Sequence, residues 1–217
     1  VYLITMDQMD QHWVTVNAGA EKAVAELGNI DYKWLAPDVK DDAKQIEAVN
    51  NAVAAGAEVL LVAANGPTAI SSALKEAADA GVKIIYVDSP ADFPAIQTLA
   101  TDNEAAGATA GREMLKALEA AGVTEGDIGI VNVNAATAST VAREKGFRAA
   151  MARHTSLPDK EIRSLIDHRL FTVEGGASAG EELLGRGATA VVAASDLMAL
   201  GVVRAVRSRG LRVPEDV

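Results

Sequence analysis

The chain has 217 residues, with 20 lysines and arginines against 30 aspartates and glutamates, which gives a formal net charge of -10. This charge repels the phosphate backbone of nucleic acids, so we expect no nucleic acid to bind through this chain. The sequence contains no cysteine, which excludes disulfides and thiolate metal sites, and it contains no apolar run long enough to span a membrane.

The first hundred residues alternate apolar, strand-like runs with helical patterns. Strands are expected at residues 1–6, 32–35, 59–63 and 82–87, and helices at residues 14–27, 41–55 and 68–80. Gly28, Gly56 and Gly81 follow the three helices, as is common where helices end. Strands that alternate with helices predict a parallel sheet with right-handed crossovers.

The stretch 99–103, read L-A-T-D-N, joins this half to a second one of the same kind. Four helices are expected in this half: from Asp102 or Asn103 to about residue 121, from 139 to 152 with Ser139 as its cap, at 173–184 and at 196–209. Three strands are expected at 128–133, 161–166 and 190–194. The predicted fold class is therefore α/β, with two Rossmann-like lobes at 1–100 and 101–217. The alternation predicts a further strand after Val217, so we expect this architecture to be incomplete at its C-terminus.

Polar side chains gather where the predicted strands end, and ligands of open parallel sheets bind in the crevice beyond these carboxyl ends. The candidate ligand-binding residues are Asp10, His12, Trp13, Asn65, Asp88, Asn103, Asn134, Arg143 and Asp196. Carboxylates and a guanidinium make charge-assisted hydrogen bonds to hydroxyls, and an indole packs on a sugar ring. The set therefore predicts a sugar or polyol ligand.

Seven of the nine candidates also have a structural interpretation. Asp196 could cap the helix that follows it, and Asp88 and Asn65 could serve turns. A solvated helix charge would explain Arg143, and core packing would explain Trp13. His12 could be a surface residue and Asn134 a loop cap.

Enzymatic motifs do not assemble. Residues 176–180 match the pattern G-x-S-x-G, but no histidine follows Ser178, since the three histidines are at 12, 154 and 168. Nucleotide loops and zinc-type histidine clusters are missing from the sequence, and Asp7 and Asp10 lack further oxygen ligands for a metal. We expect neither catalysis nor a cofactor or metal.

Two families resemble different parts of the chain. Residues 1–153 resemble the sugar-binding proteins of bacterial ABC importers, of the ribose-binding type, in D-Q-M-D-Q-H-W, Y-V-D-S-P, A-T-D-N and S-T-V-A-R-E-K-G-F. Residues from about 160 to 217 resemble the effector domains of the lactose/galactose repressor family in F-T-V-E-G-G, A-A-S-D-L-M-A-L-G-V-V-R-A-V and G-L-R-V-P-E-D-V. Because the two families share one fold, both resemblances imply the type I periplasmic-binding-protein architecture.

The resemblance implies roles for most candidates. Asp10 and Trp13 resemble ligand contacts after the first strand, and Asp88 the carboxylate that binds hydroxyls. By the same resemblance, Asn103 corresponds to the ligand-binding amide at the crossover. Arg143 corresponds to the ligand-binding guanidinium of the second lobe, and Asp196 to its carboxylate. His12 stands where the family often has an aromatic residue. The implied partner is the membrane permease of an ABC importer, and the implied location is periplasmic or extracellular, with a lipoprotein anchor as one form.

Two alternatives stay open. One is the effector-binding core of a transcription regulator without its DNA-binding domain, which would be cytoplasmic and a homodimer. The other is a truncated or chimeric product without a working function, joined near residues 151–160. Lysine is commoner than arginine up to residue 153 and arginine is commoner after it, which is consistent with such a junction.

Overall fold

The computed structural model describes residues 1–123, 126–154, 162–168 and 171–217. Contacts divide the chain into two compact units. Unit 1 comprises residues 1–101 with 136–139, and unit 2 comprises residues 102–135 with 140–217. Both are built from parallel strands and helices, which confirms the predicted α/β class.

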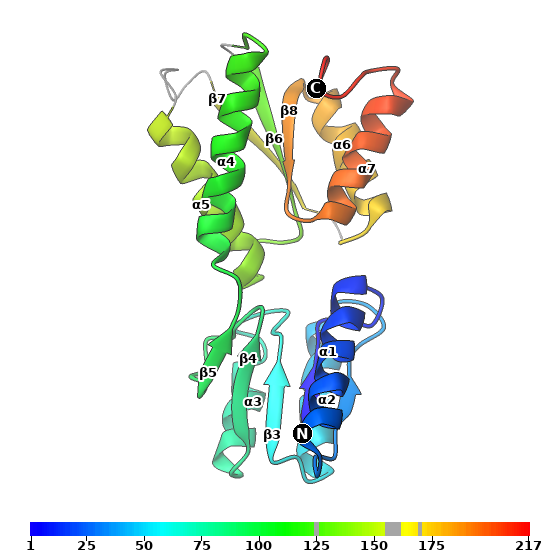
Figure 1. The fold of residues 1–217 in the computed structure, drawn as a ribbon, viewed down its shortest axis with the longest axis vertical. Coiled ribbons are helices and arrows are strands. Elements are labelled where there is room, and N and C mark those ends of the chain that lie inside the picture. The colour runs from blue at the N-terminus through cyan, green and yellow to red at the C-terminus, as the bar shows by residue number, and fades with distance from the viewer. Residues whose placement is uncertain (124–125, 155–161, 169–170) are drawn as a thin grey trace. The chain divides into compact units, whose positions relative to one another are not determined.

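Unit 1 contains a five-stranded parallel sheet in the order β2-β1-β3-β4-β5 (Figure 1). The strands are β1 (Tyr2–Ile4), β2 (Lys33–Leu35), β3 (Val59–Val62), β4 (Lys83–Val87) and β5 (Gln97–Leu99), and the helices are α1 (Gln11–Leu27), α2 (Asp42–Ala54) and α3 (Ser71–Asp79). The four expected strands and three expected helices are confirmed. The sequence analysis missed β5, whose three residues are all exposed and carry no apolar pattern.

The core of unit 1 is mainly aliphatic and contains two buried tyrosines, Tyr2 and Tyr86. Buried side chains of α2 and α3, among them Val49 and Leu74, pack against those of β1, β3 and β4. A separate cluster joins Trp13 of α1 to Met6, two residues after β1, and to Ala63, which directly follows β3. This packing ties the start of α1 to the carboxyl edge of the sheet.

Unit 2 contains a three-stranded parallel sheet in the order β7-β6-β8, with β6 (Gly126–Asn132), β7 (Ile162–His168) and β8 (Ala188–Ala193). Its helices are α4 (Asn103–Ala120), α5 (Ala138–His154), α6 (Val173–Gly185) and α7 (Asp196–Ser208). Figure 1 shows α4 and α5 on one side of these strands and α6 and α7 on the other. All the elements expected here are present.

Two helix caps differ from those that the sequence suggests. Ser139 lies inside the first turn of α5, which begins at Ala138, so Ser139 does not precede the helix as a cap. Ser195, and not Asp196, caps α7, because the Ser195 hydroxyl accepts a hydrogen bond from the Met198 N–H. At α7 the sequence offers two adjacent polar residues, and only the backbone shows which one lies outside the helix.

Glycines bring α4 and α5 unusually close together. A Cβ at Gly107 would lie 1.9 Å from the carbonyl oxygen of Arg143, and a Cβ at Gly146 would lie 1.9 Å from that of Glu104. Any larger residue at either position would force the two helices apart. This close crossing places the start of α5, including Arg143, beside the start of α4.

Candidate ligand-binding site

The loop after β1 is ordered by its own polar side chains. The Thr5 hydroxyl donates to the carbonyl of Asp7, and Oδ1 of Asp7 accepts hydrogen bonds from the N–H groups of Met9 and Asp10. Asp10 then caps α1, because its Oδ1 accepts from the N–H of His12 at 2.9 Å. The cap fixes His12 in the first turn of the helix.

Asp88 follows β4 and has a left-handed backbone, with φ at 65°. Its N–H donates to the carbonyl of Leu99 at 2.8 Å, which holds the turn against the end of β5. A non-glycine residue in this region costs about 1–3 kcal/mol, and such strain concentrates at functional sites. The backbone therefore fixes the point at the end of β4 from which the Asp88 side chain extends.

His12 and Asp88 are in direct contact. Nε2 of His12 lies 3.1 Å from Oδ2 of Asp88, although 76 residues separate them in the sequence. The Asp88 side chain is 18% exposed, whereas that of His12 is 53% exposed. Two predicted site residues thus meet at the carboxyl edge of unit 1.

Gln45 is a residue of this edge that the sequence analysis missed. Its side chain is 1% exposed and lies on the buried face of α2. Its Nε2 donates to the carbonyls of Thr5 and Ala63, and its Oε1 accepts from the N–H of Asn65. A polar residue in register with the buried Val49 and Ala52 was the signal available in the sequence. Gln45 joins the ends of β1 and β3 and fixes the backbone of Asn65.

Three buried polar atoms of unit 1 have no hydrogen-bond partner within the part of the chain that the structure describes: Trp13 Nε1, Asn65 Oδ1 and Ser89 Oγ. The amide nitrogen of Asn65 is engaged, because it donates to Asp42. Trp13 is only 3% exposed and packs in the cluster with Met6 and Ala63, as the core interpretation predicts, yet its N–H is unpaired. Ser89 was not predicted. Each unpaired group costs about 1–3 kcal/mol until something pairs with it.

In unit 2 the side chain of Arg143 is held by two hydrogen bonds. Its Nε donates to Oδ1 of Asn103 at 2.8 Å, and its Nη1 donates to the carbonyl of Ala194 at 2.7 Å. Asn103 is buried at the start of α4, and Ala194 directly follows β8. The guanidinium is therefore fixed at the carboxyl edge of this sheet, and the solvated-charge interpretation does not apply.

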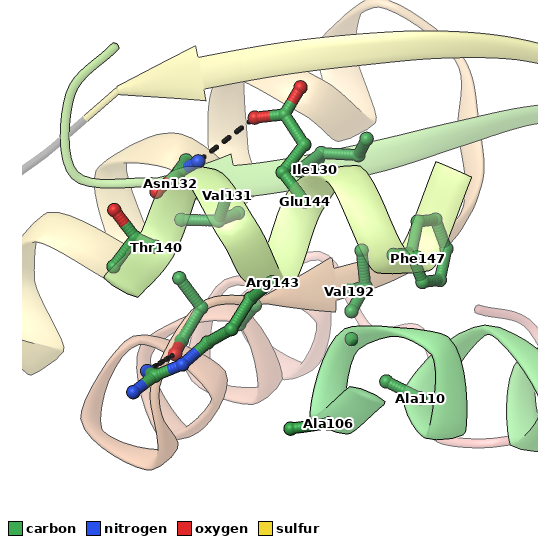
Figure 2. A pocket seen from close by; sticks show the side chains of 13 residues that line it. Ala106, Ala110, Ile130, Val131, Asn132, Thr140, Arg143, Glu144, Phe147 and Val192 are labelled. Carbon is green, nitrogen blue, oxygen red and sulfur yellow. Dashed lines mark hydrogen bonds between the residues drawn. The ribbon is translucent and has the colours of Figure 1, made fainter. Parts of the chain in front are cut away.

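A hollow of about 110 Å³ lies beside Arg143 between α4, α5 and the sheet (Figure 2). Its walls are mostly apolar and include Ala110, Ile130, Phe147 and Val192. Figure 2 shows the guanidinium directed away from Ala110 and Phe147, and Asn132 bonded to Glu144 at 2.9 Å. The hollow is small beside the ~300–1,000 Å³ of typical ligand pockets. Its polar lining residues are Asn132, Thr140, Arg143 and Glu144.

The last two predicted residues also lie in unit 2. Asp196 is exposed in the first turn of α7, and its Oδ1 accepts from the N–H of Leu197. Asn134 lies half-buried in the loop between β6 and α5. Predicted site residues that lie far apart in the sequence thus meet in each unit: His12 with Asp88 in unit 1, and Asn103 with Arg143 in unit 2.

The sequence profile of the periplasmic binding protein domain matches residues 1–216. The chain belongs to this family. The expected resemblance is thereby confirmed, and the two parallel α/β units are the architecture that it implied.

Curated relatives of this binding-protein chain are of two kinds. The D-ribose/D-allose-binding protein of Pseudomonas aeruginosa is 24% identical, and the alignment covers 97% of the chain and 66% of that protein. The HTH-type transcriptional regulator MalR of Streptomyces coelicolor is 56% identical, but over only 55 residues, which are 25% of the chain and 16% of the regulator. The chain spans 16% to 66% of the length of these two relatives.

Solved structures of binding proteins have the same fold. A sugar transporter from Clostridium phytofermentans is similar with a TM-score of 0.86 and 25% identity, covering 98% of the chain and 77% of that structure. An ABC transporter solute-binding protein from Agrobacterium vitis, solved with α-D-tagatopyranose, is similar with a TM-score of 0.84 and 25% identity, covering 96% and 72%.

Other kinds of site find no support in the described parts of this binding-protein chain. Ser178 lies within α6, so it is not on the strand-to-helix turn of a nucleophile elbow. No three histidine or acidic residues among those described are grouped so that they could hold a metal ion. Within the described residues, no helix is both long and apolar enough to cross a membrane.

Proposed function

We propose that this chain captures a monosaccharide-like sugar or polyol, as part of a solute-binding protein that delivers its ligand to the membrane permease of an ABC importer. The observation that carries the proposal is the carboxyl edge of unit 1. There Asp88, whose backbone is left-handed, directly precedes Ser89. The Ser89 hydroxyl is one of three buried polar groups that have no hydrogen-bond partner in the described part of the chain.

The chemistry of these groups suits hydroxyls. The Trp13 N–H can only donate, the Asn65 carbonyl oxygen can only accept, and the Ser89 hydroxyl can do both. A ligand hydroxyl is also both donor and acceptor, so its hydrogen-bonding type matches that of each group. The Asp88 carboxylate and the Arg143 guanidinium add charge-assisted bonds to neutral hydroxyls.

Charge favours an uncharged ligand. The chain carries a net charge of -10, and Asp7, Asp10 and Asp88 lie in the two loops at the carboxyl edge of unit 1. These carboxylates repel phosphates and sugar acids, whereas a neutral polyol meets no such penalty.

The binding mode that we propose is a cleft between two lobes, at residues 1–100 and 101–217, which closes about residues 99–103. Asp10, His12, Trp13, Asn65 and Asp88 would contribute from the first lobe, and Asn103, Asn134, Arg143 and Asp196 from the second. The proposed location is periplasmic or extracellular, where ABC importers collect their solutes.

The test is isothermal titration calorimetry with a panel of pentoses, hexoses and sugar alcohols. We expect at least one to bind, and Asp88→Ala or Arg143→Ala to abolish the heat. Matched controls are Asp79→Ala in α3 and Arg112→Ala in α4, both exposed and outside the candidate set. No heat from any member of the panel, or unchanged affinity in both site variants, would contradict the proposal.

The match to regulator sequences supports a second candidate, the effector-binding core of a transcription regulator, cytoplasmic and homodimeric. The encoding gene separates the two candidates, because a secretion or lipoprotein leader upstream of residue 1 supports the importer and a helix-turn-helix segment supports the regulator. Analytical ultracentrifugation that shows a dimer would also favour the regulator.

A further inference from the structure

We infer that His12 is a positioning residue that sets ligand affinity through Asp88. Its imidazole binds Oδ2 of Asp88 and leaves Oδ1 for the ligand. The carboxylate therefore accepts a hydrogen bond from one ligand hydroxyl, and not from two neighbouring hydroxyls. The inference rests on the proposed function, since it assigns a role at the same site.

The first argument is the geometry of the pair. The left-handed backbone at Asp88 and the bond from its N–H to the Leu99 carbonyl fix the main chain, but they leave the carboxylate free to rotate about its side-chain bonds. The Nε2 of His12, 3.1 Å from Oδ2, is the contact with the carboxylate that selects one rotamer. A fixed carboxylate loses less conformational freedom on binding than a rotating one.

The second argument is the placement of His12 itself. The Asp10 cap fixes its backbone, and its ring meets the edge of Trp13 with a centroid separation of 4.6 Å and an interplanar angle of 69°. The ring is about half exposed and outside the hydrophobic clusters, so it adds little to the core. An ion pair this exposed contributes little to stability, so its main effect is on the carboxylate that it touches.

The third argument is the charge that the imidazole can carry. The titratable groups near it are Asp88 after β4, together with Asp10 and Asp7 in the loop before α1. A neutral imidazole donates from Nε2 and leaves the charge on Asp88, whereas an imidazolium also neutralises that charge. A neutralised carboxylate is a weaker acceptor for a ligand hydroxyl.

The experiment compares the wild type with His12→Gln and His12→Leu, using the tightest-binding sugar of the panel between pH 5.5 and 8.0. We expect wild-type affinity to fall about 3- to 10-fold towards pH 5.5, across the range in which imidazoles titrate. His12→Gln keeps a donor that does not titrate, so its affinity at pH 8.0 should stay within about threefold and its profile should be flat. His12→Leu should bind about 5- to 10-fold more weakly at pH 8.0, also with a flat profile.

Gln11→Leu is the matched control, because Gln11 is exposed in the same turn of α1, and it should reproduce the wild-type profile. A His12→Leu protein with wild-type affinity and wild-type pH dependence would overturn the inference while leaving the proposed function intact. If the wild type binds no sugar at all, the proposed function fails and the inference fails with it.

Discussion

Arg143 donates its Nε hydrogen to Oδ1 of Asn103 across 2.8 Å, which joins the second turn of α5 to the first residue of α4. Asn103 therefore supports the guanidinium. The sequence predicts that Asn103 contacts the ligand directly, whereas in the structure its side chain binds another candidate residue, Arg143. The carbonyl of Ala194 completes the support from the end of β8.

Replacing Asn103 by alanine should loosen Arg143 while leaving its charge in place. We expect ligand affinity to fall less than in Arg143→Ala, and the free energy of unfolding to fall by about 1 kcal/mol for the lost hydrogen bond. Calorimetry and chemical denaturation measure the two effects. The exposed neighbour variant Glu104→Ala, which loses a surface ion pair with Lys145, is the control for stability. An Asn103→Ala protein with wild-type affinity would show that Arg143 needs no support.

Gly107→Ala should destabilise the fold by about 2–4 kcal/mol, because its Cβ would overlap the Arg143 carbonyl and push α5 away from α4. Gly19→Ala in α1 is the matched control. A Cβ there meets nothing within 4 Å, so alanine should stabilise its helix by about 0.5–1 kcal/mol. Urea denaturation of both variants measures the difference, and equal effects in the two would contradict the close helix crossing.

Gln45→Leu should cost about 2–4 kcal/mol, because the three backbone groups that the buried amide satisfies would lose their partner. We also expect ligand affinity to fall, since the backbone of Asn65 loses its anchor. Gln8→Leu is a control in which an exposed glutamine loses a single bond, to the Ala36 carbonyl. Thermal unfolding compares the two, and a mild effect at Gln45 would mean that water replaces the amide.

Stability should fall at high pH. Burial and the nearby Asp92 raise the pKa of Tyr86 to about 12, and burial and Glu21 raise the pKa of Tyr32 to about 12. Because the folded pKa of both tyrosines exceeds their ordinary pKa of 10.0, the stability that the protonated phenols contribute is complete below pH 10 and is lost as the pH rises through about 12.

Melting temperatures between pH 8 and 12 measure this loss, and absorbance at 295 nm follows tyrosinate formation. Tyr86→Phe should reduce the alkaline loss, at a cost of about 1 kcal/mol near neutral pH for the hydrogen bond from its hydroxyl to the Phe93 carbonyl. A variant as sensitive to alkali as the wild type would exclude Tyr86 as a source.

The element order could be predicted because each helix ends in a clear signal and each central strand is a buried aliphatic run. The short β5 could not, since its three exposed residues form a strand only because β4 lies beside them. The cap predicted at Ser139 was wrong, because α5 already begins at Ala138. At α7 the start at Asp196 was predicted correctly, but the adjacent Ser195 makes the capping hydrogen bond.

The candidate site was predictable as a set of residue types, but not as a set of roles. Topology alone places Asp88 at a strand end and Arg143 in the helix that follows β6. The support by Gln45, the pairing of His12 with Asp88 and the unpaired Ser89 hydroxyl depend on contacts between residues far apart in the sequence. Such contacts follow from packing, and no local pattern encodes them.

The left-handed backbone at Asp88 also bears on how this protein should be engineered. Glycine at this position would relieve the conformational penalty at once, so a library sorted for heat resistance alone should drift towards glycine there and lose the carboxylate. Sorting that alternates between heat and ligand capture should retain aspartate instead. The residue at position 88 of a selected variant would then show whether it was sorted for heat resistance alone or also for ligand binding.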